Sequence, residues 1–224
     1  MSHHMKKLAA PKVLGIPRKV GGRFVVKPSP GPHPKDRSVA LLVFLRDILK
    51  VAETAREVKK LLNKGVIKVD GKVRRDKKFP VGFMDVLTVD KKHYRILFDK
   101  KGRLFPKPIK KSANLKIGMI VRKQMVKGDK IQLTLHDGRN ILLPKTKGRK
   151  YKIGASLLIK VPSQEIVKYL PFDKGAEVYL IAGRHVGEKA KVVEVRGEKV
   201  LLKGETEYET LSDYAFPTDP EVEQ

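Results

Sequence analysis

Basic side chains recur at helical spacing in one predicted amphipathic helix, and this pattern could bind the phosphates of a nucleic acid. Arg56, Lys59, Lys60 and Lys64 fall on one side of that helix. Glu57 is the only acidic residue inside it, so little balances the four positive charges. Many basic stripes are no more than solvated helix faces. Phosphate binding is the alternative that this stripe supports, because Lys and Arg neutralise phosphates directly.

The chain directly after this helix adds basic side chains around a predicted β-hairpin. A β-branched run at 66–69 precedes the pair Asp70-Gly71, which favours a tight hairpin turn, and the chain then returns over 72–75. Arg can hold a phosphate through two hydrogen bonds, whereas Lys acts as a point charge. The basic residues expected at the rim of this hairpin are Lys68, Lys72, Arg74, Arg75 and Lys77.

Other residues that could do chemistry do not complete a catalytic or metal motif. Segment 183–189 holds Gly and Lys but lacks the order of a P-loop, so a β-turn loop is the simpler interpretation. His136 and Asp137 fall at a predicted hairpin turn, with no nucleophile motif to complete a triad. His3 and His4 could bind a metal weakly or be a cloning remnant. The absence of Cys excludes disulfides, thiolate metal sites and Cys nucleophiles. Because no catalytic motif is complete, the sequence predicts no enzyme activity, cofactor, metal or small-molecule substrate.

The charge of the chain indicates a polyanionic partner. Lys and Arg number 50 against 24 Asp and Glu, a formal charge of +26, and no Lys or Arg follows Lys203. A membrane is the other polyanionic surface to consider. The longest apolar run, Val39 to Leu45, is too short to span one, no Cys can carry a lipid, and the N-terminus lacks a signal-peptide core. We therefore expect nucleic acid as the partner, no membrane, and a cytoplasmic location.

The elements expected to position the basic stripe lie in the first half of the chain. Residues 1–37 lack periodicity and are rich in Lys, Gly and Pro, so we expect an extended arm that buries little apolar surface; a disordered leader is the alternative. A helix is predicted over Ser38–Ala52, with Ser38 as its N-cap. The next helix opens with a Thr54–Glu57 capping box and closes before Gly65. RNA-binding residues expected in the arm and first helix are Lys12, Arg18, Arg46 and Lys50.

The second half of the chain reads as short β-strands. Strand-like runs are expected at 83–89 and 94–98, followed by a turn at 99–102. Further strands are expected at 131–136, 139–143, 156–161 and 166–169, which suggests a small barrel or sandwich at about 105–172. Arg139, at the turn of one hairpin, is a candidate RNA contact.

The segment Gly175–Val195 has the order strand, Gly-rich loop, strand and resembles the KOW motif. Arg184 and Lys189 could meet phosphates there. Ala190 stands where the family usually has Gly, so the hairpin requires a negative φ at that position. The domain is expected over 173–217, with an acidic tail at 218–224 that is loose beyond Pro217. The tail could be a solvated offset to the charge, contact a basic neighbour, or hold this domain off RNA.

The stripe and hairpin described first resemble the alpha-L RNA-binding motif. The resemblance covers Thr54–Glu57 and Asn63–Val73 and implies that the second helix and the following turn face structured RNA. Over nearly the whole chain, six separated segments match in order one family of archaeal and eukaryotic small-subunit ribosomal proteins, written here as S-four-e. Those segments are Leu8–Lys12, Pro30–His33, Leu45–Asp47, Val69–Arg74, Pro80–Val86 and His136–Asn140.

The resemblance implies a structural constituent of the small ribosomal subunit, more archaeal than eukaryotic in length. Its implied partners are ribosomal RNA and neighbouring ribosomal proteins. It also implies an α+β, multi-module fold: a small αα-hairpin module at 38–104 followed by two small β-barrel or sandwich-like domains, the last SH3-like. An aromatic residue common near the arm's start is replaced here by Val13-Leu14. An RNA-modifying enzyme with an appended alpha-L module and a free-standing RNA-binding factor are the rival classes.

Overall fold

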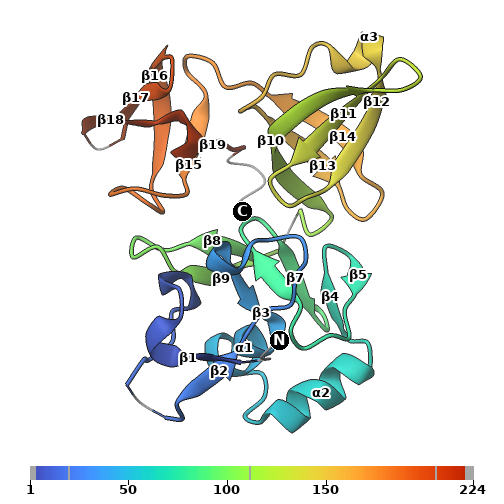
Figure 1. Cartoon of the computed structure of the whole chain (residues 1–224), viewed down its shortest axis with the longest axis vertical. Coiled ribbons are helices and arrows are strands. Elements are labelled where there is room, and N and C mark those ends of the chain that lie inside the picture. Colours follow the sequence, from blue (N-terminus) through green and yellow to red (C-terminus); the bar gives the residue numbers. More distant parts are fainter. Residues whose placement is uncertain (1–3, 20, 111, 205, 220–224) are drawn as a thin grey trace. The chain divides into compact units, whose positions relative to one another are not determined.

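The computed structural model describes residues 4–19, 21–110, 112–204 and 206–219. The chain divides into two compact units, 1–113 and 114–224, which are described separately (Figure 1). Short helices occur with five antiparallel sheets, so the predicted α+β class is confirmed.

The first unit is built on a five-stranded antiparallel sheet in the order β5-β4-β7-β8-β9. Its strands are β4 (Ile67–Val69), β5 (Lys72–Val73), β7 (Val86–Val89), β8 (Lys92–Phe98) and β9 (Leu104–Ile109). Because β9 is paired along its length with β8, the sheet continues past the boundary expected at 104/105. The expected division into arm and modules otherwise stays a prediction.

The helix predicted over Ser38–Ala52 is wrong at both ends. Residues Ser38–Ala40 form strand β3, which pairs with β6 (Pro80–Gly82). The helical part comprises α1 (Leu41–Val43) and a π-helical turn at Phe44–Ile48. Lys50 then ends it with a φ of 53°. The apolar run that starts this segment is buried all round, and such a run does not distinguish a buried strand from a helix.

The second predicted helix is confirmed as α2 (Ala55–Asn63). The Thr54 hydroxyl oxygen accepts from the Glu57 amide at 3.2 Å, and the Glu57 carboxylate accepts from the Glu53 amide at 3.0 Å. Together these bonds form a capping box that satisfies amides at the helix start. Gly65 has the left-handed φ of 73° expected just beyond the helix end. Val58 and Leu62 are fully buried on the apolar side of α2, whereas Ala55 is exposed.

The described part of the N-terminal segment buries more apolar surface than expected. It pairs β1 (His4–Lys6) with β2 (Phe24–Val26) and contains 3-10 turns at Lys7–Ala9, Lys12–Leu14 and Lys35–Arg37. Leu14 is fully buried and Val25 is 5% exposed, so the expectation of little burial was wrong. The segment has short apolar pieces without periodicity, and tertiary packing rather than local pattern buries them.

The Pro-rich end of this segment is fixed to the first unit by a buried pair. His33 Nε2 lies 3.0 Å from both carboxylate oxygens of Asp85. The same carboxylate accepts from the Gly82 amide at 2.9 Å. A Cβ on Gly82 would lie 2.4 Å from the His33 ring, so only glycine fits beneath it. The strand expected at 83–89 begins only at Val86 because Met84 has a φ of 64°.

The second unit begins with a five-stranded sheet in the order β12-β11-β10-β13-β14. The hairpin expected at 131–143, with its turn at Asp137-Gly138, and the strands expected near 156–161 and 166–169 are confirmed. The strands are β10 (Leu115–Val126), β11 (Lys130–Leu135), β12 (Asn140–Pro144), β13 (Ser156–Lys160) and β14 (Glu165–Leu170), and α3 (Lys145–Gly148) follows β12. The core on one side of this sheet includes Ile120, Leu133, Leu157 and Ile159.

A further five-stranded sheet, β18-β17-β16-β15-β19, completes the second unit. Its strands are β15 (Glu177–Leu180), β16 (Lys189–Arg196), β17 (Lys199–Lys203), β18 (Glu207–Leu211) and β19 (Ala215–Pro217), with a 3-10 turn at Ser212–Tyr214. Ala190 lies inside β16, paired with Val178 and outside the positive-φ region, so the hairpin forms without glycine there.

The expectation that the chain is loose beyond Pro217 was wrong for the next two residues. Thr218 is buried and its amide donates to the Glu177 carbonyl at 2.9 Å. Asp219 is also buried and accepts from Lys168 Nζ at 2.6 Å. Ala215 and Phe216, directly before Pro217, are buried as well. The rest of the acidic tail, 220–224, lies outside the described residues.

Candidate nucleic-acid interface

The basic residues of α2 form one exposed face. Val58 and Leu62 anchor the helix through its apolar side and leave the other side to solvent. The basic side chains of this face are all exposed: Arg56, Lys59, Lys60 and Lys64. No described residue forms an ion pair or hydrogen bond with any of them.

The β4–β5 hairpin continues this face. Its turn residues Asp70 and Gly71 have φ values of 52° and 74°, which close the two-residue loop. The buried Asp70 carboxylate accepts from the Val86 amide at 2.9 Å and ties the turn to β7. A Cβ on Gly65 would lie 3.6 Å from Val73, so the end of α2 lies against β5, as Figure 1 shows. Helix and hairpin therefore form a single surface.

The predicted hairpin residues differ in how freely they can meet a ligand. Lys68, Lys72, Arg75 and Lys77 are exposed. Arg74 is half-buried, and its guanidinium carbon lies 4.3 Å from the centre of the Phe79 ring. This stacking holds Arg74 in place and buries its Nε, so it contributes to packing as well as to charge. We call the α2 face and the four exposed hairpin residues the α2–hairpin surface.

Two of the four basic residues predicted in the arm and first helix are already engaged. The Arg46 guanidinium donates to Asp47 at 2.8 and 2.9 Å, and these hydrogen bonds raise the pKa of Arg46. Arg18 donates to the carbonyls of Leu8 and Ala10 at 3.2 and 3.0 Å. Both side chains hold local structure. The structure does not bring them into the α2–hairpin surface.

Lys12 and Arg18 instead line a hollow of about 250 Å³ in the first unit. Lys101 and Arg103 line the same hollow, and no described acidic residue does. These last two were not expected from the sequence, because they lie in and after a turn whose pattern indicates only a strand connection. Lys50 is exposed and lines a different hollow, beside Arg46.

Arg139 belongs to a buried ion network in the second unit. Its Nε donates to Asp137 at 2.8 Å, and Lys116 Nζ lies 2.8 Å from the same carboxylate oxygen. The Lys116 and Asp137 side chains are each 1% exposed. Burial by itself raises the pKa of Asp137, but the adjacent charges of Lys116, His136 and Arg139 outweigh it and lower the pKa to about 2. Lys116 was not expected from the sequence, because an alternating strand pattern predicts that polar side chains face solvent.

Arg184 and Lys189, predicted in the last sheet, are exposed, in the β15–β16 loop and at the start of β16. Much of this domain's positive charge is paired internally. Lys191 lies 3.8 Å from Glu177, Arg196 lies 2.6 Å from Glu194, and Lys199 lies 3.6 Å from Glu209. Such exposed pairs add little stability, but they leave less net charge for a polyanion than the α2–hairpin surface does.

Within the described ranges, no helix is long and apolar enough to cross a membrane. Nor do three or more described His, Asp or Glu residues gather as a metal site would require.

Comparison with known proteins places this geometry in a family. The model of the S4 domain matches residues 41–87, that of the RS4NT (NUC023) domain matches 1–36, and that of ribosomal family S4e matches 90–166. The chain is 46% identical to small ribosomal subunit protein eS4 of Archaeoglobus fulgidus and 42% identical to that of Methanocaldococcus jannaschii. Each match covers 95% of this chain and 92% of the relative.

A solved structure agrees with these matches. The crystal structure of 30S ribosomal protein S4e from Thermoplasma acidophilum superposes with a TM-score of 0.72 at 33% identity, covering 82% of this chain and 95% of that one. The resemblance inferred from the six separated segments is therefore confirmed, and the chain belongs to the eS4 family of small ribosomal subunit proteins.

Proposed function

We propose that this chain is a structural constituent of the small ribosomal subunit and binds ribosomal RNA through the α2–hairpin surface. One observation carries the proposal: the S4 domain match at 41–87 contains α2 and the β4–β5 hairpin, where exposed basic side chains form one surface without acidic partners among the described residues. Its relatives are named as small-subunit proteins, which supports a structural role rather than a catalytic one.

Recognition through the RNA backbone fits the side chains on this surface. Lys and Arg dominate it, and Phe79, the ring beside it, is covered by Arg74. The surface therefore offers charge and shape rather than platforms for stacked bases. If about six to ten phosphates are contacted, affinity falls roughly 10³- to 10⁵-fold between 50 and 200 mM salt. A flat salt dependence would contradict backbone recognition.

A charge-reversal variant tests the proposed surface. We expect Lys60→Glu, Lys64→Glu and Lys72→Glu together to abolish specific binding to small-subunit ribosomal RNA, because all three side chains are exposed and their loss leaves the core intact. Arg74 is left unchanged because it packs on Phe79.

The matched control reverses three lysines in or near β9, at the opposite edge of the same sheet from β5. These are Lys100→Glu, Lys107→Glu and Lys110→Glu, with the same change in net charge. The control should retain most of the affinity at 150 mM salt. Equal losses in the two variants would show that binding follows net charge alone and would refute the α2–hairpin surface as the site.

Residence in the small subunit is tested separately from RNA affinity. The protein should sediment in stoichiometric amount with the small subunit after washing in high salt. Release into the supernatant would favour a free-standing RNA-binding factor. Neighbouring ribosomal proteins are further proposed partners, and the arm and first-helix residues Lys12 and Lys50, with Arg184 and Lys189, remain proposed RNA contacts.

A further inference from the structure

The second unit carries a basic surface that the proposed function does not use. Between residues 121 and 152 there are ten Lys and Arg but only two acidic residues, Asp129 and Asp137. Asp137 pairs with Lys116 and Arg139, and Asp129 lies 3.2 Å from Lys145 Nζ. Apart from Arg139 and Lys145, the cations of this segment therefore have no acidic side chain within it to offset them.

Four of these cations gather where the chain leaves β12 through α3. These four exposed residues, which we call the α3 platform, are Lys147, Arg149, Lys150 and Lys152. No described residue forms an ion pair with any of them.

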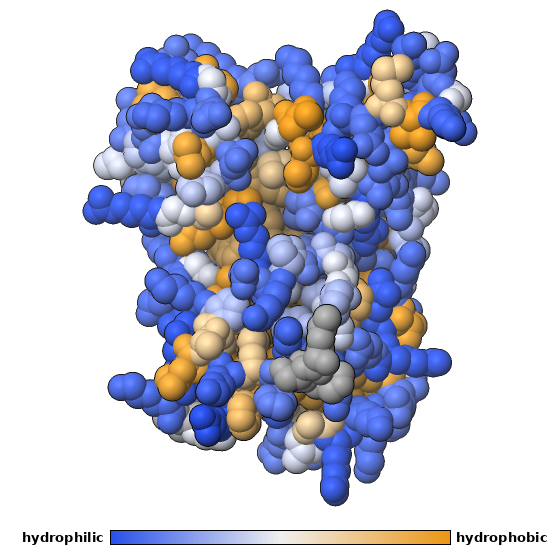
Figure 2. All heavy atoms as spheres, viewed as in Figure 1, coloured by the Kyte–Doolittle hydropathy of each residue, from blue (hydrophilic) through white to orange (hydrophobic). Residues whose placement is uncertain are grey.

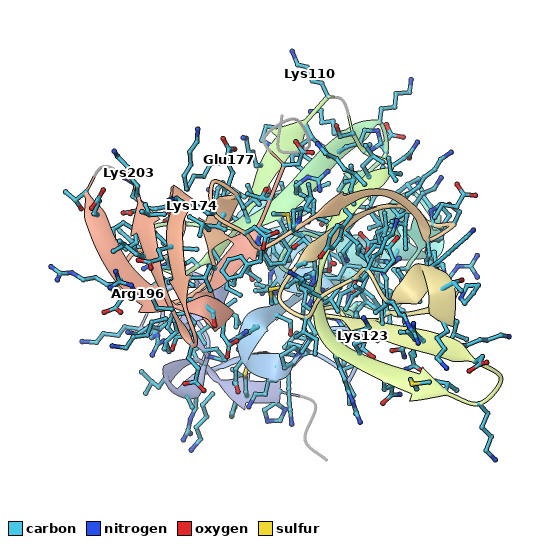
Figure 3. The ribbon with its side chains drawn as sticks, turned by 90° about the horizontal axis from the view of Figure 1, so that it is seen from above. Lys110, Lys123, Lys174, Glu177, Arg196 and Lys203 are labelled. Carbon is cyan, nitrogen blue, oxygen red and sulfur yellow. The ribbon has the colours of Figure 1, made fainter. Side chains whose placement is uncertain are left out.

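The backbone beneath the α3 platform is held in place from two sides. Lys123 of β10 donates through Nζ to the carbonyls of Arg149 at 2.9 Å and Tyr151 at 2.7 Å. A Cβ on Gly148 would lie 2.8 Å from Cβ of Ile131, so the chain packs on β11 more closely than any other residue permits. Figure 3 shows Lys123 on β10 beside α3. Fixed backbone means that less conformational entropy is lost when the platform meets a ligand.

The platform suits a phosphate backbone rather than exposed bases. Tyr151 is 6% exposed, and Lys150 Nζ lies 5.1 Å from its ring centre. The half-buried ring of Tyr169 packs edge-on against Tyr151, and its hydroxyl accepts from the Lys152 amide at 3.4 Å. Both rings are engaged in packing, which leaves little ring surface on which a base could stack. Lys and Arg without acidic partners are instead the groups that neutralise phosphates and release counterions.

We propose that the α3 platform is a second RNA-backbone site, which binds phosphates of ribosomal RNA independently of the α2–hairpin surface. The proposal rests on the proposed function for the identity of the RNA. Because the two sites lie in different compact units of one chain, each adds to the affinity of the other by raising its local concentration near the RNA.

The test uses the full chain and purified small-subunit ribosomal RNA. The platform variant carries Lys147→Glu, Arg149→Glu and Lys150→Glu. The control carries Lys160→Glu, Lys174→Glu and Lys203→Glu, an equal change of charge in the same unit. Lys160 pairs with Leu115, at the opposite end of β10 from the hairpin next to α3. Lys174 and Lys203 belong to the segment and sheet that follow β14 (Figure 3). Circular dichroism and thermal unfolding establish that each variant is folded. If the platform variant is not, the milder set Lys147→Gln, Arg149→Gln and Lys150→Gln replaces it.

The expected readout is the dependence of affinity on salt. If three phosphate contacts are lost, the affinity ratio between 50 and 200 mM salt shrinks by about 20- to 40-fold in the platform variant. The control should keep the parent slope, and hydroxyl-radical footprints of the RNA should lose one protected region while keeping that of the α2–hairpin surface.

The outcomes separate the two proposals. An unchanged slope and footprint in the platform variant, with binding lost in the Lys60, Lys64 and Lys72 variant, would overturn the second site and leave the proposed function standing. Equal losses in platform variant and control would also overturn it. Failure of the parent protein itself to bind the RNA would refute the proposed function.

Discussion

Replacing Asp137 with Asn is expected to destabilise the second unit by about 3–5 kcal/mol, because the change removes the carboxylate that faces the buried charge of Lys116. The side chains of both residues are almost completely buried, and their nearest atoms are 2.8 Å apart. Removing one member of a buried pair leaves the desolvation penalty of the other uncompensated. In an exposed pair, water solvates the charge that remains, so the loss is much smaller.

The pKa of Asp137 provides an independent magnitude. Lowering it from 3.8 to about 2 corresponds to about 2.5 kcal/mol of folded-state stability. Since the folded-state pKa is below the unfolded value, this stability is fully present above about pH 4 and is lost as pH falls towards 2. Protonation and substitution both remove the negative charge beside Lys116. The substitution also puts an amide NH2 group in place of a carboxylate oxygen that can accept hydrogen bonds, so its loss is the larger one.

The assay is urea unfolding followed by tyrosine fluorescence, because five of the six Tyr residues lie in the second unit. Asp213→Asn is the matched control, since Asp213 is an exposed acidic residue of the same unit. The parent and control should lose about 2 kcal/mol more than Asp137→Asn between pH 5 and pH 2. A loss at pH 7 below 1 kcal/mol, or an identical acid response in all three proteins, would refute the reasoning. The double variant Lys116→Met with Asp137→Leu should recover much of the loss.

Three smaller predictions concern the elements that hold the two basic surfaces. Thr54→Ala should lower the stability of the first unit by about 1 kcal/mol through loss of the α2 cap, measured by circular dichroism; no change would mean that the cap is dispensable. Gly148→Ala should cost about 1–3 kcal/mol, since its Cβ meets Ile131 at 2.8 Å, and an unaffected thermal midpoint would contradict this. Lys123→Met should weaken RNA binding several-fold, because Lys123 positions the α3 platform. The salt dependence of the affinity should change by less than the loss of one phosphate contact would cause. A slope change as large as that of the platform variant would instead make Lys123 a direct phosphate ligand.

Local chemistry made parts of the fold predictable. The Thr54–Glu57 box, Gly65 and the Asp70-Gly71 turn each require particular residue types for a local physical reason, and each formed where expected. The helix predicted from Ser38 failed because its first residues are buried on every side. Their pairing with Pro80–Gly82 depends on a segment some forty residues away, which periodicity does not register.

The sequence predicted which basic residues are candidates for RNA binding. It did not predict which of them form ion pairs within the protein. Arg46 and Arg139 were predicted as RNA contacts alongside Lys60 and Lys64, yet each is engaged by a carboxylate two residues away or closer. Whether a neighbouring carboxylate points at an Arg depends on the backbone between them. That backbone is a π-helical turn in one case and a hairpin turn in the other.

The ion pairs within the protein also indicate which parts of the chain keep positive charge for RNA binding. In the last sheet, Lys191, Arg196 and Lys199 meet carboxylates on the same or neighbouring strands, so this domain largely neutralises itself. The α2–hairpin surface and the α3 platform lack such partners among the described residues. Counterions condense on RNA and are released only where unpaired cations replace them. Affinity should therefore follow the unpaired cations on these two surfaces, and reversing an internally paired Lys such as Lys199 should change it far less than reversing Lys64.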